Sequence, residues 1–225
     1  MNIATRFVAV GLLSLAAACT TSPDSPTAQA SATGHAFPLF NAHDLTGWTI
    51  RGGHASFSVE DGAIVGRTVP NQPNSFLCTD ATFGDFDLSL EFKVDKELNS
   101  GVQIRSQARS SGSSEIVFGY QIEIDPAPRA WTAGLYDEGR RGWLKDLAAN
   151  PTAQAAFKQG AWNTLRIRVQ GDTFNTWLNG VPAVVDFKDA MTPQGFIGLQ
   201  VHSVGARKAP LEVRWRKIEL IDLSH

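Results

Sequence analysis

Apolar and polar residues alternate along much of this chain, and two nearby segments show the pattern most clearly. In residues 99–107, NSGVQIRSQ, Val102 and Ile104 are apolar, and in residues 119–125, GYQIEID, every second residue is apolar. Successive side chains of a β-strand point to opposite faces of the sheet, so both segments are predicted to be strands with one face in a core. The other face carries amides, carboxylates and a guanidinium instead of the Lys, Thr and Ser expected on a solvated sheet.

Short runs of the same kind, separated by turn residues, recur along the rest of the chain. They are residues 57–67, 86–94, 164–185, 195–203 and 211–223. Within the first run, Asp61-Gly62 predicts a hairpin turn. Residues 143–160 look helical instead, and Pro151 suits a first-turn position. Because there is no βαβ alternation and no repeat, the sequence predicts one all-β domain with a short helical insertion.

Composition fits this prediction and excludes some functions. The chain has 225 residues, of which 43% are hydrophobic and 19% charged, so it can form one large globular domain with a sizeable core. The formal net charge is only -2 and no block of Lys or Arg stands out, so nucleic acid is not an expected partner. The sequence also contains no phosphate-binding loop, no Cys-x-x-Cys, no His-Glu-x-x-His and no Gly-x-Ser-x-Gly motif.

The N-terminal residues predict export. Arg6 precedes an apolar run, residues 8–18, that is too short to cross a bilayer as a helix. The small residues directly before Cys19 resemble a bacterial lipoprotein signal. We therefore expect residues 1–18 to be a signal peptide and Cys19 to be the acylated first residue of the mature protein. Plain secretion with cleavage nearby is the alternative.

A three-part organisation follows from this reading. Residues 19–36, rich in Ser, Thr, Pro and Ala, are expected to be a disordered tether, and residues 37–225 the folded domain. Thr20 after the cysteine resembles an outer-membrane sorting signal, which predicts a lipoprotein facing the periplasm. Cys78 lies in an apolar, strand-like run and is expected to be a packed core thiol and not a nucleophile.

Candidate chemistry lies on the polar faces of the predicted strands. Residues 195–203 add two members, Gln200 and His202. The whole set, drawn from four strands, comprises Glu91, Gln103, Arg105, Gln121, Glu123, Asp125, Gln200 and His202. Such groups offer hydrogen-bond donors and acceptors together, which a polyhydroxylated ligand requires. The alternative is a solvated, salt-bridged outer face.

Residues 126–143 form a predicted long loop that is rich in aromatic and charged residues, and loops of this length are often functional. Aromatic rings can stack on the apolar faces of sugars, and arginine can hold sugar hydroxyls. Tyr136, Arg141 and Trp143 are therefore candidate substrate-binding residues. Alternatively, Trp131 or Trp143 fills the edge of the sandwich.

Seven segments in a fixed order resemble one known family. They are FNAHDLTGW, LEFKVDKELNSGVQIRS, GYQIEID, LYDEGRRGWL, GAWNTLRIRVQGDTFNTWLNGV, GFIGLQVH and VRWRKIEL. Spread from Phe37 to Leu223, they resemble the 3-keto-disaccharide hydrolase domain family, formerly a domain of unknown function. The resemblance implies a concanavalin- and laminarinase-like jelly-roll sandwich of two antiparallel sheets, with the site on a concave face. It also implies cleavage of glycosides that carry a ketone at C3.

The implied chemistry assigns roles to the polar set. A C3 ketone acidifies the C2 proton, a general base removes this proton, and the enolate then expels the C1 substituent. The resemblance makes Glu123 and Glu91 the catalytic carboxylates, Arg105 the cation at the enolate oxygen, and His202 an acid or base. The residues expected to bind the sugar are Gln103, Gln121, Asp125, Tyr136, Arg141, Trp143 and Gln200. A sugar 3-oxidoreductase is expected to act upstream.

Other mechanisms and functions stay open at this point. Glu91 and Glu123 could flank the scissile bond as in an ordinary glycosidase. Although no cofactor is expected, Glu91, Glu123, Asp125 and His202 could instead hold a divalent cation that polarises the ketone. The protein could also be a non-catalytic carbohydrate-binding module, since a sandwich fold does not fix function, or a structural protein of the cell envelope.

Overall fold

The computed structural model describes residues 1, 34–112, 114–208 and 210–224. Cys19, residues 2–18 of the predicted signal peptide and residues 19–33 of the predicted tether lie outside the described residues. All described strands belong to one compact unit, Ala32–His225. The described residues contain no helix with the length and apolar character needed to cross a lipid bilayer.

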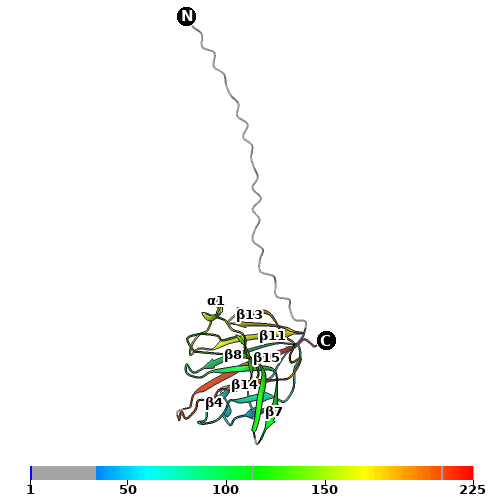
Figure 1. Ribbon diagram of the computed structural model, residues 1–225, viewed down its shortest axis with the longest axis vertical. Coiled ribbons are helices and arrows are strands. Elements are labelled where there is room, and N and C mark those ends of the chain that lie inside the picture. Colours follow the sequence, from blue (N-terminus) through cyan, green and yellow to red (C-terminus); the bar gives the residue numbers. More distant parts are fainter. Residues whose placement is uncertain (2–33, 113, 209, 225) are drawn as a thin grey trace. The chain divides into compact units, whose positions relative to one another are not determined.

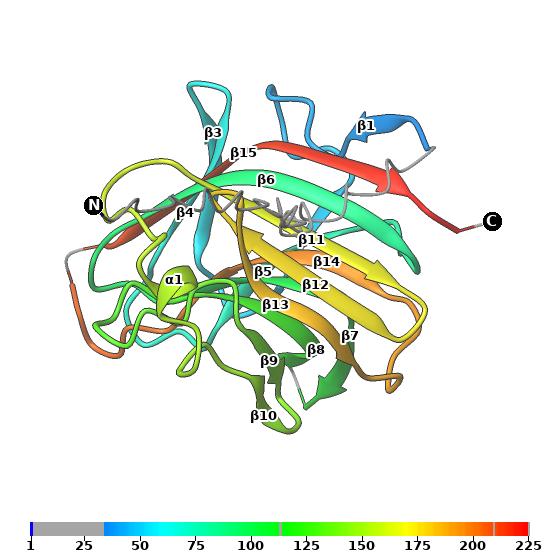
Figure 2. The same ribbon diagram turned by 90° about the horizontal axis from the view of Figure 1, so that it is seen from above.

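The described strands form two antiparallel sheets (Figure 1). The first sheet has eight strands; Figure 2 shows its strands β11, β6 and β15 side by side. In spatial order it consists of β13 (Val181–Lys188), β12 (Thr173–Leu178), β11 (Asn163–Gln170), β6 (Phe86–Val94), β15 (Glu212–Asp222), β4 (Ala63–Arg67) and β3 (Ser56–Glu60), with β1 (Ala36–Pro38) also paired to β15.

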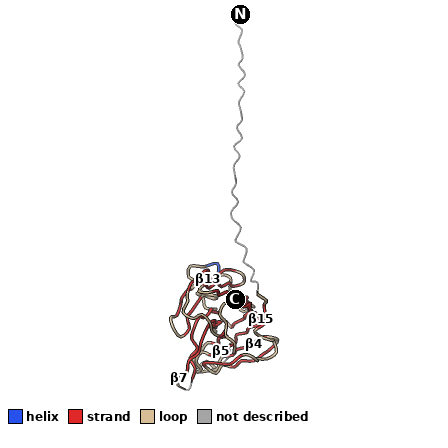
Figure 3. The backbone as a smooth tube through the Cα atoms, turned by 90° about the vertical axis from the view of Figure 1, so that its right-hand side faces the viewer, coloured by secondary structure: helices blue, strands red, loops and turns tan. Residues whose placement is uncertain are grey.

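The second sheet has seven described strands. In spatial order it consists of β10 (Gly142–Lys145), β9 (Leu135–Glu138), β8 (Ser114–Ile124), β7 (Ser100–Ser111), β14 (Phe196–Val201), β5 (Ser75–Thr79) and β2 (Trp48–Gly52). Strands β7 and β14 pair although they are far apart in sequence, so this sheet, like the first, depends on long-range pairing. Strands dominate the backbone tube of Figure 3, where the one described helix is short.

The apolar faces of the two sheets pack together in one core. The alternating residues Leu88, Leu90 and Phe92 of β6 are buried in the same core as Ile122 and Ile124 of β8. This is the alternation predicted from the sequence, and the fold is the predicted β-sandwich of two antiparallel sheets. The hairpin predicted at Asp61-Gly62 is also present, because it joins β3 to β4. In the described structure, Cys78 is a free and fully buried thiol.

Two local predictions need correction. The helix α1 is a single turn, Pro151–Gln154, with Pro151 in its first turn and Asn150 accepting from the Ala153 N–H at the N-cap. The start of the segment predicted to be helical is the strand β10. Similarly, the end of the predicted long loop, residues 135–143, is mostly the hairpin of β9 and β10. The aromatic side chains there stand on a sheet and not on a free loop.

The far half of the β7–β8 hairpin bends over the outer face of the second sheet. The bend lies where the pairing of β7 with β8 shifts register, at Arg105 (φ 45) and opposite Gly119 (φ 138). A Cβ on Gly119 would lie 2.4 Å from Ser106 Oγ, so only glycine fits there. Beyond the bend, Glu115 of β8 accepts a hydrogen bond of 2.9 Å from Arg51 of β2. The hairpin therefore forms a wall beside the outer face of this sheet.

Candidate active site

A polar hollow lies on the outer face of the second sheet, beside this wall. Its volume is about 320 Å³, within the range typical of small-molecule sites. It is lined by Asn74, Asn99, Gln121, Glu123, Arg129, Tyr136, Glu138, Trp143, Gln200 and His202. We call it the Glu123 hollow. Its lining comes from β8, β9, β10 and β14, from residues flanking β5, β7 and β14, and from the loop between β8 and β9, so long-range strand pairing builds it.

The sheet register explains how the floor of the hollow forms. Gly101 of β7 lies opposite Glu123 of β8 on one side and opposite Gln200 of β14 on the other. Opposed residues share a face of the sheet, so these three positions form one row across the outer face. A Cβ on Gly101 would lie 2.5 Å from the Gln121 side chain. The glycine therefore leaves the space that the long polar side chains occupy.

A chain of amides holds the Glu123 carboxylate. Ser106 Oγ donates to Gln103 Oε1 at 2.7 Å, and Gln103 Nε2 donates to Gln121 Oε1 at 2.6 Å. Gln121 Nε2 then donates to Glu123 Oε2 at 2.8 Å, while Asn99 Nδ2 donates to Oε1 at 2.6 Å. Because each amide is fixed by the one before it, the carboxylate orientation is set before any ligand binds. Each oxygen keeps a second lone-pair direction for a ligand proton.

The environment of Glu123 suits a general base. Its side chain is buried, and burial raises the pKa of its carboxyl above the ordinary value. The hydrogen bonds from Asn99 and Gln121 favour the charged form and lower this pKa only in part. A carboxylate whose pKa is shifted toward neutrality accepts a proton more readily than an exposed one.

The side-chain amide of Gln200 has no hydrogen-bond partner within the described part of the protein. Its side chain is 0% exposed, and neither Oε1 nor Nε2 has a partner there. A buried amide without partners costs free energy, about 1–3 kcal/mol per lost group. Since Gln200 lines the Glu123 hollow, a polar ligand there is the natural partner for both atoms.

A second carboxylate and an imidazole complete the lining. Glu138 of β9 accepts a hydrogen bond of 3.3 Å from Asn74 Nδ2. Burial raises the pKa of Glu138, and the hydrogen bond from Asn74 and the nearby charge of His202 offset this only in part. His202 directs Nδ1 at the carbonyl oxygen of Ser203, 2.9 Å away, so that Nε2 is left for other contacts. A second carboxylate and an imidazole thus share the hollow with Glu123.

Arginine and aromatic rings form the remaining side. Asp125 is buried and accepts a hydrogen bond from Arg129 Nε. The Arg129 guanidinium lies 4.9 Å from the ring centre of Trp131 and 5.4 Å from that of Trp143. Trp143 in turn contacts Tyr136 edge to face at 5.3 Å. The hollow therefore presents the fixed guanidinium of Arg129 beside aromatic surfaces.

Most of the predicted site residues meet in or directly behind this hollow. Gln121, Glu123, Tyr136, Trp143, Gln200 and His202 line it. Gln103 lies behind the lining and orients Gln121, and Asp125 orients Arg129. Trp131 packs partly against the main core, as one sequence-based alternative suggested for one of the two tryptophans.

The prediction that Glu91 faces the same hollow is wrong. Glu91 lies on β6 of the first sheet, not on the second. Its oxygens accept hydrogen bonds from Arg216 Nε at 2.7 Å and Lys217 Nζ at 2.8 Å. Burial acts to raise the pKa of Glu91, but these two bonds outweigh it and the pKa is lowered. Glu91 is thus a salt-bridged residue of an outer sheet face.

The prediction that Arg105 points into the site is also wrong. The register shift turns its side chain toward the first sheet, where it is 1% exposed near the Phe174 ring. Its guanidinium donates to the carbonyl oxygens of Gly84 at 2.7 Å and Gly171 at 2.8 Å, and to Asp85 at 2.7 Å. Arg105 therefore ties the two sheets together.

Arg141 lies outside the hollow as well. It pairs with Asp137, which is fully buried, and with Asp189 at 2.7 Å. Tyr120 donates to the same Asp189. This cluster fixes β9 against residues 189–192 behind the site. Arg141 is thus placed to support the strand that carries Tyr136 and Glu138, and does not itself line the hollow.

Because Glu91 lies on the other sheet, it cannot share a divalent cation with Glu123, Asp125 and His202. Among the described residues, no group of three His, Cys, Asp or Glu side chains could hold a metal ion. The sequence had assigned no individual role to Asn74, Asn99 or Glu138. Glu138 alternates with Tyr136 along strand β9, but the sequence predicts a loop for this segment.

Comparison with solved structures identifies the class of fold. Three solved structures share the fold over most of the chain. A Bacillus subtilis protein of unknown function with a galectin-like fold has a TM-score of 0.62 at 13% identity, covering 84% of this chain and 94% of its own. The carbohydrate-binding module CBM66 of Bacillus subtilis has a TM-score of 0.56 at 15% identity, covering 81% and 99%. A Parabacteroides distasonis protein described as a candidate glycosyl hydrolase has a TM-score of 0.57 at 17% identity, covering 85% and 94%.

The fold is thus that of galectin-like β-sandwiches. More particularly, the chain belongs to the 3-keto-alpha-glucoside-1,2-lyase-like domain family, whose model matches residues 35–221. The family resemblance seen in the sequence is confirmed. A search of curated proteins gave no match.

Proposed function

We propose that the Glu123 hollow cleaves glycosides oxidised to a ketone at C3, by removal of the C2 proton and elimination at C1. The observation that carries the proposal is the buried Glu123 carboxylate, fixed by Asn99 and Gln121 and raised in pKa by burial. The family to which the chain belongs, described as 3-keto-alpha-glucoside-1,2-lyase-like, supports the same chemistry.

The first step is a proton transfer from carbon. A Glu123 oxygen takes the C2 proton, and the C2–H electron pair moves into a C2=C3 bond as the ketone becomes an enolate. The enolate oxygen carries the new negative charge, so it requires donors. Arg129, held by Asp125, and Gln200 Nε2, which lacks a partner among the described residues, supply them. Arg129 replaces Arg105 in this role.

The second step breaks the glycosidic bond. The enolate returns to a ketone, a C1=C2 bond forms, and the C1–O bond breaks with its electron pair leaving on oxygen. His202, which shares the hollow with Glu138, donates the proton that this oxygen needs. The products are an alcohol and a 1,2-unsaturated 3-keto sugar. Addition of water across C1=C2 completes a net hydrolysis, whereas release before this addition makes the protein a lyase.

The wider setting is part of the same proposal. The substrate carries a ketone that ordinary glycosides lack, so an oxidoreductase acting on the C3 hydroxyl must supply it. We further propose that the protein is exported and anchored through acylated Cys19, facing the periplasm from the outer membrane. The n-region, the apolar run and Thr20 of the sequence support this.

The test compares oxidised and ordinary glycosides. The purified protein is incubated with a 3-keto-disaccharide and, separately, with the matching unoxidised disaccharide, with and without a chelator. The proposal predicts an alcohol product and a 3-keto sugar from the first substrate only. Cleavage of both substrates at equal rates would instead indicate an ordinary glycosidase.

A non-catalytic carbohydrate-binding module is the second candidate. It is favoured by the fold shared with CBM66 and by the side-chain amide of Gln200, which lines the hollow and lacks a partner among the described residues. Such a module predicts saturable sugar binding in the same hollow and no product after prolonged incubation. The two candidates therefore differ in turnover and not in the location of the ligand.

A further inference from the structure

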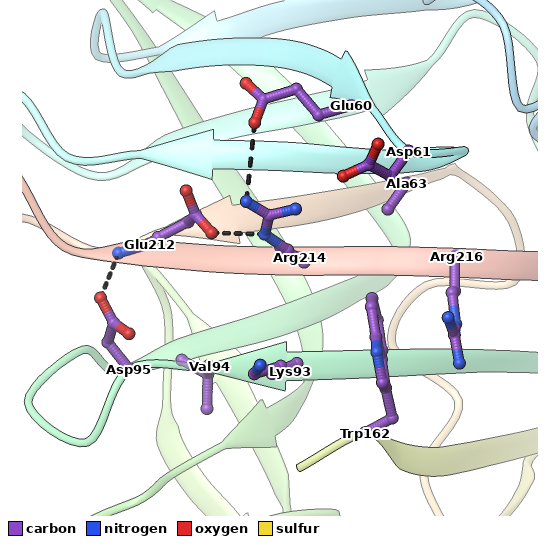
Figure 4. A pocket seen from close by; sticks show the side chains of 10 residues that line it. All are labelled: Glu60, Asp61, Ala63, Lys93, Val94, Asp95, Trp162, Glu212, Arg214 and Arg216. Carbon is purple, nitrogen blue, oxygen red and sulfur yellow. Dashed lines mark hydrogen bonds and ion pairs between the residues drawn. The ribbon is translucent and has the colours of Figure 1, made fainter. Parts of the chain in front are cut away.

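A second hollow lies on the outer face of the first sheet (Figure 4). Its volume is about 360 Å³, which again falls in the small-molecule range. Residues from β3, β4, β6 and β15 form its base and one side, and Trp162, just before β11, forms the other side. We call it the Trp162 hollow. It shares no lining residue with the Glu123 hollow.

An ion-pair network makes one side of this hollow rigid. Arg67 bridges Glu60 at 2.6 Å and Glu212 at 2.7 Å. Arg214 contacts the same two carboxylates, at 3.5 Å for Glu60 and through Nε for Glu212. Four planar side chains thus hold one another in place. Networks of this kind lose less conformational entropy on ligand binding than single flexible side chains do.

Two charged groups of the hollow have no partner within the described part of the protein. These are Lys93 of β6 and Asp61, at the turn between β3 and β4. Asp95 uses one oxygen to accept the Glu212 N–H at 2.8 Å. The hollow therefore presents an ammonium donor and carboxylate acceptors, and its charges are of both signs. This balance suits a neutral ligand with both donors and acceptors better than an anion.

Trp162 gives the hollow an aromatic wall. Arg216 covers one face of the indole, with Cζ 4.0 Å from the ring centre. In Figure 4 the indole stands between Arg216 and Lys93, so its other face is directed at the hollow. A flat apolar surface among fixed polar groups is the combination that binds a sugar ring, whose faces are apolar and whose rim is hydroxylated.

We propose that the Trp162 hollow is a second, non-catalytic carbohydrate site that binds an unoxidised sugar unit. The sugar ring stacks on the open face of Trp162, and its hydroxyls bond to Lys93, Asp61 and Asp95. The site does not depend on the lyase chemistry, because it lies on the other sheet and lacks the buried carboxylate of Glu123. It would hold the protein on a glycan while the Glu123 hollow acts elsewhere.

The test follows the indole N–H signals of the six tryptophans by NMR. The Trp162 signal is assigned by its loss in W162F. Cellobiose, maltose and trehalose are then titrated separately into the purified protein. We expect at least one to move the Trp162 signal saturably. In W162A its affinity should fall roughly 2- to 10-fold, the range for losing one stacked ring. Folding of each variant is checked by circular dichroism.

Trp177 offers a matched control on the same sheet. It also lies under an arginine, with Arg166 at 4.7 Å, but it lines no part of the Trp162 hollow. W177A should therefore bind the sugar as the wild type does. If W162A does not fold, the double variant K93A/D61N should show the same loss. The proposal is overturned if no sugar moves the Trp162 signal, if only the Trp143 signal moves, or if W177A weakens binding equally.

Discussion

The side-chain amide of Gln121 donates a hydrogen bond of 2.8 Å to Glu123, two residues along the same strand. Both side chains stand on the outer face of the second sheet because strand residues two apart share a face. Gln121 is itself fixed by Gln103 at 2.6 Å. The orientation of the proposed base is therefore set by the strand pairing of β7 and β8.

Replacement of Glu123 tests the proposed base. E123Q keeps nearly the same shape and can accept a hydrogen bond from Asn99 or Gln121 but not from both. It cannot act as a base, so kcat should fall about 10²- to 10⁴-fold. Steady-state kinetics on a 3-keto-disaccharide give the value. The matched control is E91Q, which removes a carboxylate from the outer face of the first sheet. Its kcat should stay within a small factor of wild type, and a large loss in E91Q would restore the sequence-based assignment.

Two buried glutamines form a second matched pair. The side chain of Gln200 has no partner among the described residues, whereas that of Gln103 both donates to Gln121 and accepts from Ser106. Q200L should keep or raise the melting temperature and lower kcat/KM about tenfold or more, since a contact to the enolate oxygen worth roughly 1–3 kcal/mol is lost. Q103L should lower the melting temperature. Equal destabilisation by the two changes would contradict a ligand-facing Gln200.

Arg105 should prove structural. R105M leaves the carbonyl groups of Gly84 and Gly171 and the carboxylate of Asp85 without their donor. We expect a loss of about 3 kcal/mol in the free energy of unfolding, the lower end for a broken buried pair because Asp85 is partly exposed. Urea unfolding measures it, with R207M at an exposed pair as control. A normal stability combined with a large loss of kcat would place Arg105 in the chemistry.

The raised pKa of Glu123 also predicts how stability depends on pH. Burial raises this pKa in the folded state above its unfolded value. The stabilising contribution of the protonated form is complete below the unfolded pKa and is lost as pH rises through the folded pKa. The melting temperature of E123Q relative to wild type should therefore be most favourable at neutral pH and should fall in acid. A relative melting temperature that rises in acid would contradict the burial argument.

The sequence predicts correctly which strand face carries the polar side chains, but it does not predict which strands lie side by side. Alternation alone placed Gln121, Glu123 and Gln200 on polar strand faces, and all three line the hollow. The same alternation placed Glu91 on a polar face, also correctly, but sheet membership depends on long-range pairing that local pattern does not encode. The prediction for Arg105 failed for another reason, because a register shift breaks the period of two.

Strand β9 shows a third limit. This strand has only four residues, Leu135–Glu138. It is too short and too polar to be distinguished by pattern from the surrounding Gly, Arg and Asp residues. Pairing with β8 makes the segment a strand and directs Tyr136 and Glu138 to one face. Glu138 therefore became a candidate only when the pairing was known. Family resemblance supplied the chemistry, which no pattern of polarity contains.

Hydrogen exchange at C2 tests the central claim most directly. A 3-keto-disaccharide deuterated at C2 is incubated with wild-type protein and with E123Q, and NMR follows the C2 position in substrate and product. The account predicts that wild type removes deuterium from C2 in step with cleavage and that E123Q leaves it in place. Cleavage by wild-type protein with C2 deuterium fully retained would contradict proton abstraction by Glu123 and the elimination mechanism with it.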